Sequence, residues 1–214
     1  MQVSLIWATP QAEQLIADIA RVSAPERQGY PPEGLIAFLL RNDHWSPFEM
    51  VSMCVEIVTT RAISRQILRH RSFSFQEFSG RWSSMAKLEP LAAPICRLQN
   101  PKDRARPLLD IPPEVDAWWR TKTRLVRLET EQLYQEALDR GIAREVARSL
   151  LPEGLTTTRL YMAGTYRSWL HYLRLRLKPD TQLEHREVAE GVLREFKQVA
   201  PMLWGAYQAV LQDR

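Results

Sequence analysis

Hydrophobic and polar residues along the chain repeat with two periods, and the period changes from one segment to the next. Val51, Met53, Val55 and Ile57 alternate with more polar residues, which predicts a half-buried strand. Other short stretches predict extended structure at Val3–Ala8, Ser72–Phe78 and Thr156–Met162. Wider apolar spacing predicts helices at about Gln11–Val22, Glu33–Asn42, Ala62–Arg69, Glu114–Asp139, Ala143–Leu151, Tyr166–Arg176, Glu184–Phe196 and Met202–Leu211. The predicted fold is therefore α+β, mostly helical, with a small antiparallel sheet.

Prolines mark the two main interruptions of this pattern. A Gly-Tyr-Pro-Pro turn lies around Tyr30. Prolines then recur from Pro90 to Pro113, a stretch that is either a loop-rich insertion or an interdomain linker. We expect the insertion, within a single domain over residues 1–214. The long helix that follows is predicted to be amphipathic, with apolar positions that include Leu125, Leu128, Leu133 and Leu138.

Composition supports one globular domain, because 45% of the residues are hydrophobic and the chain is long enough to bury a core. No apolar run of 18 residues occurs, so we expect no membrane span. The first residues lack the basic start and the apolar stretch of a signal peptide. Cys54 falls on a predicted strand as a small core residue, and Cys96 lies among the prolines without the neighbours of an activated thiolate. Two isolated cysteines indicate a reducing, cytoplasmic setting.

The charge pattern is dominated by arginine. The formal net charge is +4 and the sequence pI is about 9.3. Arginine presents a planar fork of donors that suits phosphate and carboxylate groups. A bias in coding composition explains the same arginine content, and composition alone does not separate the two explanations.

The stretch from Arg69 to Arg81, R-H-R-S-F-S-F-Q-E-F-S-G-R, carries the densest chemistry. It combines three arginines, a histidine and a glutamate with a Ser-Gly pair. Gly80 lets the backbone approach a ligand closely and leaves amide groups free to point at it. The segment therefore predicts an anion-binding site that contains one acidic residue.

The helix before this stretch carries Arg61, Arg65 and Arg69 at intervals of four residues, so the three share one face. Like charges at this spacing repel, and something negative should meet them. The negative partner is either acidic side chains or a bound phosphate. A solvated basic stripe explains the same pattern without any ligand.

A second cationic segment runs from Tyr166 to Arg176. Helical spacing places Arg167, His171 and Arg174 on one face, and Arg176 nearly opposite, on an apolar face. An arginine there needs a partner, because an unpaired buried charge is costly. That partner is either a core glutamate or a substrate that carries or develops negative charge.

Other kinds of site find little support in the sequence. Four scattered histidines without a close pair make a metal site unexpected, and His185 is interpreted as a helix-surface residue. The chain contains no glycine-rich dinucleotide fingerprint and no P-loop, so pattern alone does not predict FAD.

The two cationic segments together resemble the signature of the flavin-dependent thymidylate synthases. Arg69, His70 and Arg71 are followed at fixed spacing by Ser79, with Glu77, Gly80 and Arg81 in the family's positions. Further matches are the H-W-S-P-F-E run from His44, Gln66, the A-R-S-L-L-P run containing Arg148, the R-S-W-L-H-Y run from Arg167, Arg176, and Gln182-Leu-Glu184. The chain departs from many members near Gly164 and at Asp180, where the family often has Asn and His.

The resemblance implies site residues and partners. It implies FAD contacts by Ser46, Arg69, His70, Arg71, Glu77, Arg167 and His171. It implies contacts with dUMP by Gln66, Ile67, Leu68, Arg69, Glu77, Phe78, Ser79, Gly80, Arg81, Arg148 and Arg176. It also implies a homotetramer with sites formed at subunit interfaces, and it implies neither a metal, a nucleic acid nor a membrane as a partner.

The implied reaction is the reductive methylation of dUMP to dTMP. Methylenetetrahydrofolate donates the carbon unit, and FAD reduced by NADPH donates the hydride. We expect Arg176 to stabilise the ionised uracil ring in place of a catalytic cysteine. Arg81 and Arg148 would hold the phosphate, and Ser79 would position dUMP without acting as a nucleophile.

Two other interpretations remain open from the sequence. A small RNA-binding module would use the arginines together with aromatic residues such as Phe73, Phe75 and Trp82. A degenerate relative of the family would retain the fold only as an oligomeric scaffold.

Overall fold

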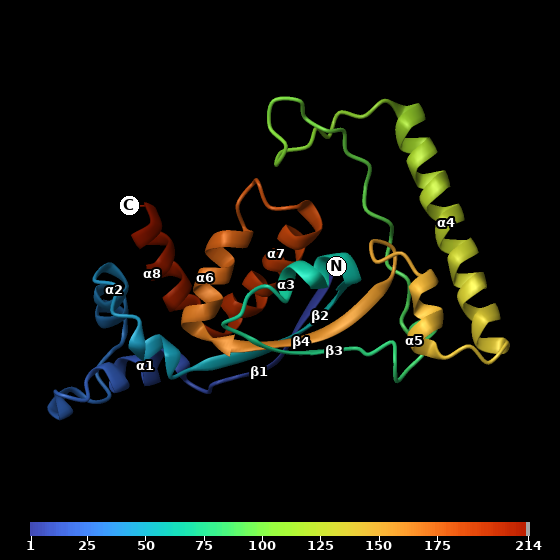
Figure 1. Ribbon diagram of the computed structural model, residues 1–214. Helices are drawn as coiled ribbons and strands as arrows, with labels where there is room; N and C mark the ends of the chain where they lie inside the picture. Colours follow the sequence, from blue (N-terminus) through green and yellow to red (C-terminus); the bar gives the residue numbers. More distant parts are fainter. Residues whose placement is uncertain (213–214) are drawn as a thin grey trace.

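A four-stranded antiparallel sheet organises the protein in a computed structural model that describes residues 1–212. Its strands run in the order β1-β2-β4-β3, so the two long strands occupy the centre (Figure 1). The bounds are Gln2–Ala8 for β1, Ser52–Thr60 for β2, Ser74–Glu77 for β3 and Thr157–Thr165 for β4. The sheet brings together residues from both cationic segments, because β3 pairs with β4 from Ser74↔Ala163 to Glu77↔Leu160.

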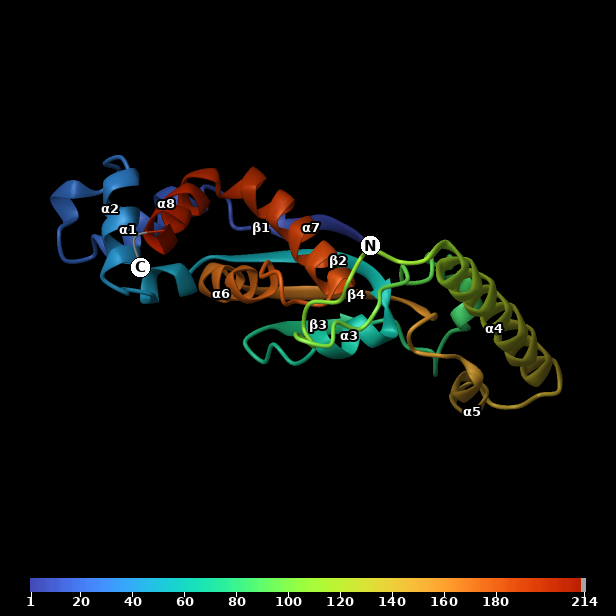
Figure 2. The same ribbon diagram turned by 90° about the horizontal axis from the view of Figure 1, so that it is seen from above.

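The helices cover one face of this sheet. Seen in Figures 1 and 2, the helices α3, α6 and α7 lie over the strands on one side. Their bounds are Arg61–Ile67 for α3, Tyr166–Arg176 for α6 and Leu183–Val199 for α7. The strand pattern agrees: Leu160 and Met162 of β4 are fully buried, whereas Arg159 and Tyr161, which alternate with them, are exposed. The buried face is lined by large side chains of α6 and α7, among them Trp169, Tyr172 and Phe196.

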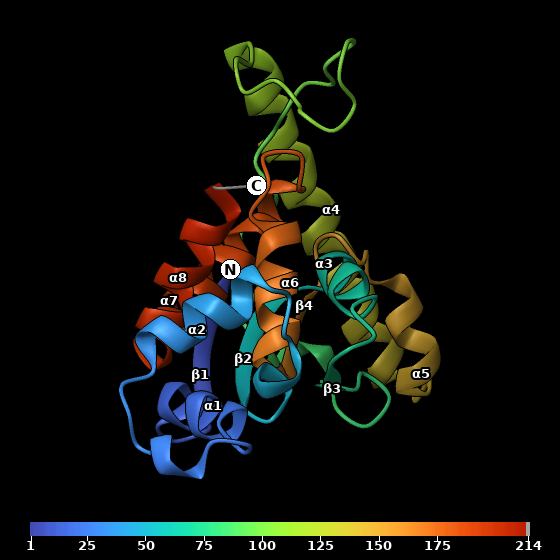
Figure 3. The same cartoon turned by 90° about the vertical axis from the view of Figure 1, so that its left-hand side faces the viewer.

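The remaining helices extend the protein at its two ends. Figure 3 shows α1, α2 and α8 together at one end. They span Ala12–Ala20, Glu33–Arg41 and Pro201–Gln212. At the other end, α4 (Pro113–Asp139) and α5 (Arg144–Ala147) enclose a second, smaller core made of Met85, Tyr134, Ala137 and Ala147.

The structure confirms the predicted fold class, a mostly helical α+β domain with a small antiparallel sheet. Several bounds differ. The strand predicted to end at Met162 continues to Thr165, because its whole length pairs with β2. The helix predicted over Ala143–Leu151 is a short α5 followed by a 3-10 turn at Arg148–Leu150.

The long helix α4 buries a different set of residues from the one its pattern predicted. Its buried residues are Thr123, Tyr134 and Ala137. The leucines Leu125, Leu128 and Leu133 are instead between 43% and 52% exposed. Only the part of α4 near α5 packs against the small core; Leu138 lies there, as predicted, whereas the other three leucines face outward in the single chain.

The proline-rich stretch before α4 has no helix or strand of its own between residues 90 and 112, apart from one bridge between Leu98 and Leu108. This agrees with the predicted loop. Within the described part of the chain, no helix has the length and apolar character needed to cross a membrane.

Candidate functional site

The R-H-R segment meets the second cationic segment through a direct contact. Arg176, at the end of α6, donates from Nε to Nε2 of His70 over 2.9 Å. The accepting nitrogen must be unprotonated, so His70 carries its proton on Nδ1. Burial, with a smaller contribution from the positive charge of Arg176, lowers the pKa of His70 to about 4. His70 is therefore neutral at pH 7, and it orients the guanidinium without opposing its charge.

Aromatic residues form the walls around this pair. The ring of Tyr172 meets the His70 ring edge to face, with centroids 4.9 Å apart. Tyr172 is fully buried, and burial raises the pKa of its hydroxyl. Arg176 was expected to find either a core glutamate or a substrate. In the single chain its Nε partner is a histidine.

The ring of His185 also lies near that of His70, with the two ring centroids 6.2 Å apart. The prediction that His185 lies on the helix surface is wrong, because its side chain is fully buried. Burial lowers its pKa to about 3, with smaller contributions from Arg176 and His70. The missed signal was helical spacing: His185 precedes Val188, Ala189 and Val192 on the buried face of α7.

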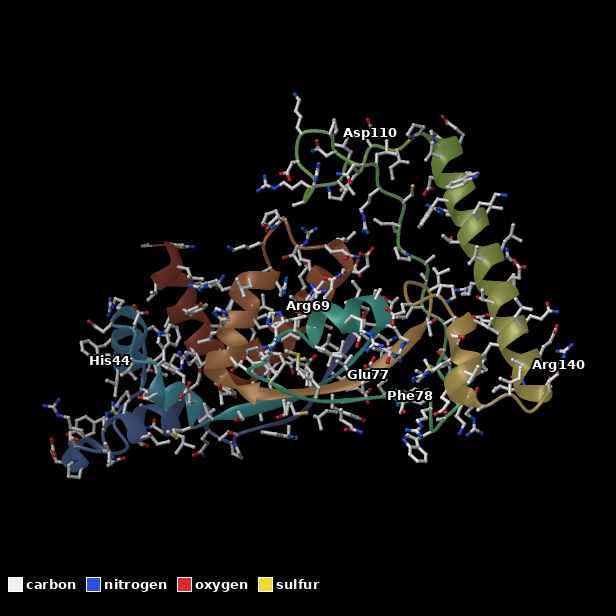
Figure 4. The ribbon with its side chains drawn as sticks, in the orientation of Figure 1. His44, Arg69, Glu77, Phe78, Asp110 and Arg140 are labelled. Carbon is white, nitrogen blue, oxygen red and sulfur yellow. The ribbon has the colours of Figure 1, made fainter. Side chains whose placement is uncertain are left out.

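Arg69 and Arg71, on either side of His70, are both exposed. The chain reverses here through a turn in which Phe73 N donates to His70 O over 3.2 Å. Figure 4 shows Arg69 in the middle of the molecule, with Glu77 close below it. Ile67 before this turn is buried and Leu68 is half-buried, so these two residues anchor the end of α3.

Glu77 has the most elaborate set of partners among the predicted residues. Its Oε1 accepts a hydrogen bond from Ser64 Oγ at 2.8 Å and another from Thr158 Oγ1 at 2.9 Å. Both donors are fully buried. Arg61 Nη1 lies 3.9 Å from the same oxygen. These donors hold the carboxylate in a fixed orientation through one oxygen.

The acidic partners predicted for the arginine face of α3 are present in part. Arg61 faces Glu77, and Arg65 pairs with Glu153 at 3.2 Å. Two of the three arginines on this face therefore have acidic partners. Arg69, the third, is the one that adjoins His70.

The Ser79-Gly80-Arg81 turn lies beside α5. A Cβ atom at Gly80 would stand 2.7 Å from Met85 Sδ and 3.5 Å from Arg148 Cδ, so a side chain here would displace Met85. Arg81 Nε pairs with Glu145 at 2.8 Å. Phe78, labelled in Figure 4, packs against the small core next to this turn. The turn and Arg148 were predicted to act together, and the structure brings them together.

Arg148 also lines a cavity of about 410 Å³. The charged residues around this cavity are Arg61, Arg65, Glu145, Arg148 and Glu153. The excess of arginine in its walls suits an anionic group.

A larger cavity of about 610 Å³ lies against α6. Arg167, His171 and Arg174 line it from one face of the helix, as the spacing predicted, and Ser72 lines it from the R-H-R segment. Arg167 forms an ion pair with Glu49. Glu49 ends the 3-10 turn that begins at Ser46, which places Ser46 near this cavity.

The predicted residues thus form separate groups within one chain. Arg81 and Arg148 lie by α5, whereas Arg176 lies with His70 at the end of α6. Figures 1 and 2 show α6 over the sheet and α5 beyond the far end of the strands, next to α4. His44 stands apart from all of them: it is exposed and has its ring against Phe38, at the end of the molecule marked in Figure 4.

Within the described residues, no group of three or more histidine, cysteine, aspartate or glutamate side chains is placed to hold a metal ion. The predicted residues described above carry guanidinium, imidazole and carboxylate groups. These groups can bind anions, orient a ligand and stabilise negative charge.

Comparison with known proteins identifies the family of this chain. The family model described as Thymidylate synthase complementing protein matches residues 4–202. The flavin-dependent thymidylate synthase of Synechocystis is 46% identical over 196 residues, covering 92% of this chain and 89% of the relative. A probable flavin-dependent thymidylate synthase of Paramecium bursaria Chlorella virus 1 is 42% identical over 198 residues, covering 90% of each.

A solved structure supports the same relationship. The UMP/dUMP methylase PolB from Streptomyces cacaoi, crystallised with 5-Br dUMP, superposes with a TM-score of 0.83 at 29% identity. The match covers 97% of this chain and 94% of PolB. The fold is that of a class of nucleotide-methylating enzymes. The chain belongs to the thymidylate synthase complementing protein family, that of the flavin-dependent thymidylate synthases.

Proposed function

We propose that the protein methylates dUMP reductively to dTMP, with methylenetetrahydrofolate as carbon donor, FAD as bound cofactor and NADPH as the reductant of the flavin. The observation that carries this proposal is the contact between Arg176 and His70, which joins the two halves of the family signature in one place. The names of the relatives and the dUMP analogue bound by PolB support the substrate and the flavin.

The cavity against α6 fits a phosphorylated cofactor. Arg167 and Arg174 supply guanidinium groups, and His171 and Ser72 add polar groups. We propose that Arg167 leaves Glu49 to hold a phosphate of FAD, with Ser46, Arg69, His70, Arg71, Glu77 and His171 completing the contacts. When bound, FAD supplies the hydride for the reaction.

The turn by α5 fits the phosphate of dUMP. Arg81 and Arg148 bring two guanidinium groups to it, and Arg148 lies against the buried Gly80. Arg81 would exchange its exposed partner Glu145 for the phosphate. Ser79 would orient the nucleotide, with Gln66, Ile67, Leu68, Arg69, Glu77 and Phe78 around the base and sugar.

Arg176 has the chemistry that activation of uracil requires. Carbon 5 becomes nucleophilic when the ring imide loses its proton and the charge spreads over the ring. A guanidinium remains cationic at every relevant pH and stabilises that charge. His70 holds it by Nε, so the terminal nitrogens remain directed toward a ligand. No cysteine takes part in this scheme, since Cys54 is a buried free thiol in the core.

The distance between the groups within one chain supports a site shared between subunits. We propose a homotetramer in which Arg81 and Arg148 of one subunit meet Arg176 of another. The outward leucines of α4 offer apolar surface for such contacts. Both cysteines are free, which agrees with the reducing cytoplasm that we propose as its location.

The test uses the purified full-length protein. We expect a flavin absorption spectrum, directly or after FAD and dUMP are added. With methylenetetrahydrofolate and NADPH, the enzyme should release tritium from [5-³H]dUMP and form dTMP. Absence of both products from FAD-loaded protein, together with salt-sensitive binding of oligonucleotides, would favour the RNA-binding alternative instead.

A further inference from the structure

The proline-rich loop, residues 90–112, is joined to the sheet domain by a buried ion pair. Arg97 Nη2 lies 2.7 Å from Oε1 and 3.0 Å from Oε2 of Glu184, in the first turn of α7. The Arg97 side chain is 14% exposed and that of Glu184 is 5% exposed. Figure 1 shows the loop on the side of the sheet that carries α3 and α7.

A chain of hydrogen bonds leads from Glu184 to the residues beside Arg176. Gln182 Nε2 donates to Glu184 Oε2 over 3.0 Å. Gln66 Nε2 donates to Gln182 Oε1 over 2.7 Å. The Oε1 of Gln66 then lies 3.3 Å from Nδ1 of His185, whose ring is close to His70. We refer to Arg97, Glu184, Gln182, Gln66 and His185 as the relay.

The charge at one end of the relay fixes the direction of every bond in it. An ionised carboxylate only accepts, so Gln182 must turn its NH₂ group toward Glu184 and its oxygen toward Gln66. Gln66 must then give its NH₂ group to Gln182 and turn its oxygen toward His185. His185 consequently carries its proton on Nδ1, which leaves Nε2 as a bare acceptor. In the described chain that Nε2 is buried and has no partner.

We infer that Arg97 is a positioning residue: it holds the Glu184 carboxylate in place, and through the relay it fixes the side-chain amide of Gln66 for nucleotide binding. This inference rests on the proposed function, in which Gln66 contacts dUMP. Without Arg97, the buried carboxylate of Glu184 has no cation beside it and moves toward solvent. Gln182 then loses its fixed acceptor, so Gln182 and Gln66 are free to turn over. The same change also releases the loop.

The first test measures the loop by hydrogen–deuterium exchange in the full-length protein. Arg97→Met should increase exchange across residues 90–112 by about tenfold or more, because a buried charge pair is lost. The matched control is Arg106→Met, since Arg106 pairs only with Asp103 of the same loop, at 3.6 Å, within the described chain. Arg97→Lys should restore protection in part. Unchanged exchange in Arg97→Met would overturn the anchoring role, and this readout does not depend on any activity.

The second test separates positioning from stability. Glu184→Gln still accepts from Arg97 through its amide oxygen but loses the charge, so protection of the loop should fall less than in Arg97→Met. Its NH₂ group now faces Gln182 and reverses the relay. We therefore expect the KM for dUMP to rise about tenfold with a smaller change in kcat. A normal KM in a folded Glu184→Gln would overturn the relay. Failure of the proposed function would appear differently, as wild-type protein that does not turn over dUMP at all.

Discussion

Arg176 and His70 are 106 positions apart in the sequence, yet Nε of the first donates to Nε2 of the second over 2.9 Å. The bond fixes three properties at once. It sets the plane of the guanidinium, it sets the tautomer of the imidazole, and it brings the R-H-R segment to the end of α6. The two strands β3 and β4 make this possible, because they carry the two segments side by side.

Replacing Arg176 tests its role in ionising the uracil ring. Arg176→Ala should retain bound flavin, because Arg167 and His171 line a separate cavity. Tritium release from [5-³H]dUMP should fall about 10²–10³-fold, the usual effect of removing one preorganised donor. Arg176→Lys keeps the charge but loses the fork, so its activity should be intermediate. Wild-type rates in Arg176→Ala would falsify the ionisation role.

Arg81 should act on binding more than on chemistry. Its partner Glu145 is half-exposed, so loss of that pair changes stability by only about 0–1 kcal/mol. Arg81→Ala should raise the KM for dUMP about tenfold or more with kcat nearly retained, because a phosphate contact is lost. Titration with dUMP followed by flavin absorbance checks this. An unchanged KM would remove Arg81 from the phosphate site.

The carboxylate of Glu77 depends on two hydroxyl donors that the family signature does not contain. Thr158→Val keeps the shape of the side chain but removes one bond to a charged group, so the free energy of unfolding should fall by about 1.5–3 kcal/mol. Binding of flavin or dUMP should weaken as Glu77 loses its fixed orientation. Denaturant unfolding and flavin titration measure both effects.

Thr59→Val is the matched control for this substitution. Thr59 is equally buried in the adjacent strand, but its hydroxyl faces only Met1 Sδ, at 3.3 Å. Sulfur is a weak acceptor, so the control should lose less stability. Equal losses in the two variants would mean that the hydrogen bond to Glu77 contributes no more to stability than the contact with Met1.

The two buried histidines predict how stability depends on pH. The pKa of His70 is lowered to about 4 and that of His185 to about 3, from 6.5 in the unfolded chain. Below pH 6.5 the unfolded chain therefore binds protons that the folded chain excludes. Stability should fall with falling pH, by about 1.4 kcal/mol per pH unit for each histidine. For His70 the loss continues to about pH 4, and for His185 to about pH 3.

Substitution of one histidine isolates its share of this slope. His185→Gln should flatten the decrease in unfolding free energy between pH 6 and 4, as measured by denaturant titration at each pH. A slope identical to that of the wild type would show that His185 is protonated in the folded protein. His171 is not a useful probe, because it is exposed and the shift in its pKa is small.

Gly164 is one of the positions at which the resemblance led us to expect a departure from the family, and the structure explains why a side chain is excluded here. A Cβ atom would stand 2.4 Å from Cδ1 of Phe73, two residues after Arg71. Gly164→Ala should cost about 1–3 kcal/mol of stability through overpacking, and it should weaken flavin binding by displacing the R-H-R turn. Gly34→Ala on α2, with no atom within 4 Å, should leave the melting temperature unchanged or raise it.

The sequence predicted the elements and the local clusters well, because both depend on short-range patterns. The face shared by Arg167, His171 and Arg174 follows from helical spacing, and the structure has it. The placement of Arg148 beside Gly80 followed from the family signature rather than from any pattern, since 68 positions lie between them.

Long-range burial was harder to predict. His185 was misassigned because a histidine is normally polar, although its spacing to Val188 and Val192 matches the buried face of α7. The leucines of α4 were misleading in the opposite way: apolar spacing predicts a covered face, but it does not specify what covers it. Neither Arg97 nor Thr158 belongs to a motif, so only the three-dimensional contacts reveal their partners.

The distance between Arg81 by α5 and Arg176 on α6 has a genetic consequence. If each nucleotide is held by guanidinium groups from two polypeptides, an Arg81→Ala chain and an Arg176→Ala chain are defective in different halves of the same pocket. Co-expressed in one cell, they would assemble some pockets that contain neither lesion. Two alleles that each fail to support growth without thymidine should then do so together, whereas two alleles of the same cluster should not.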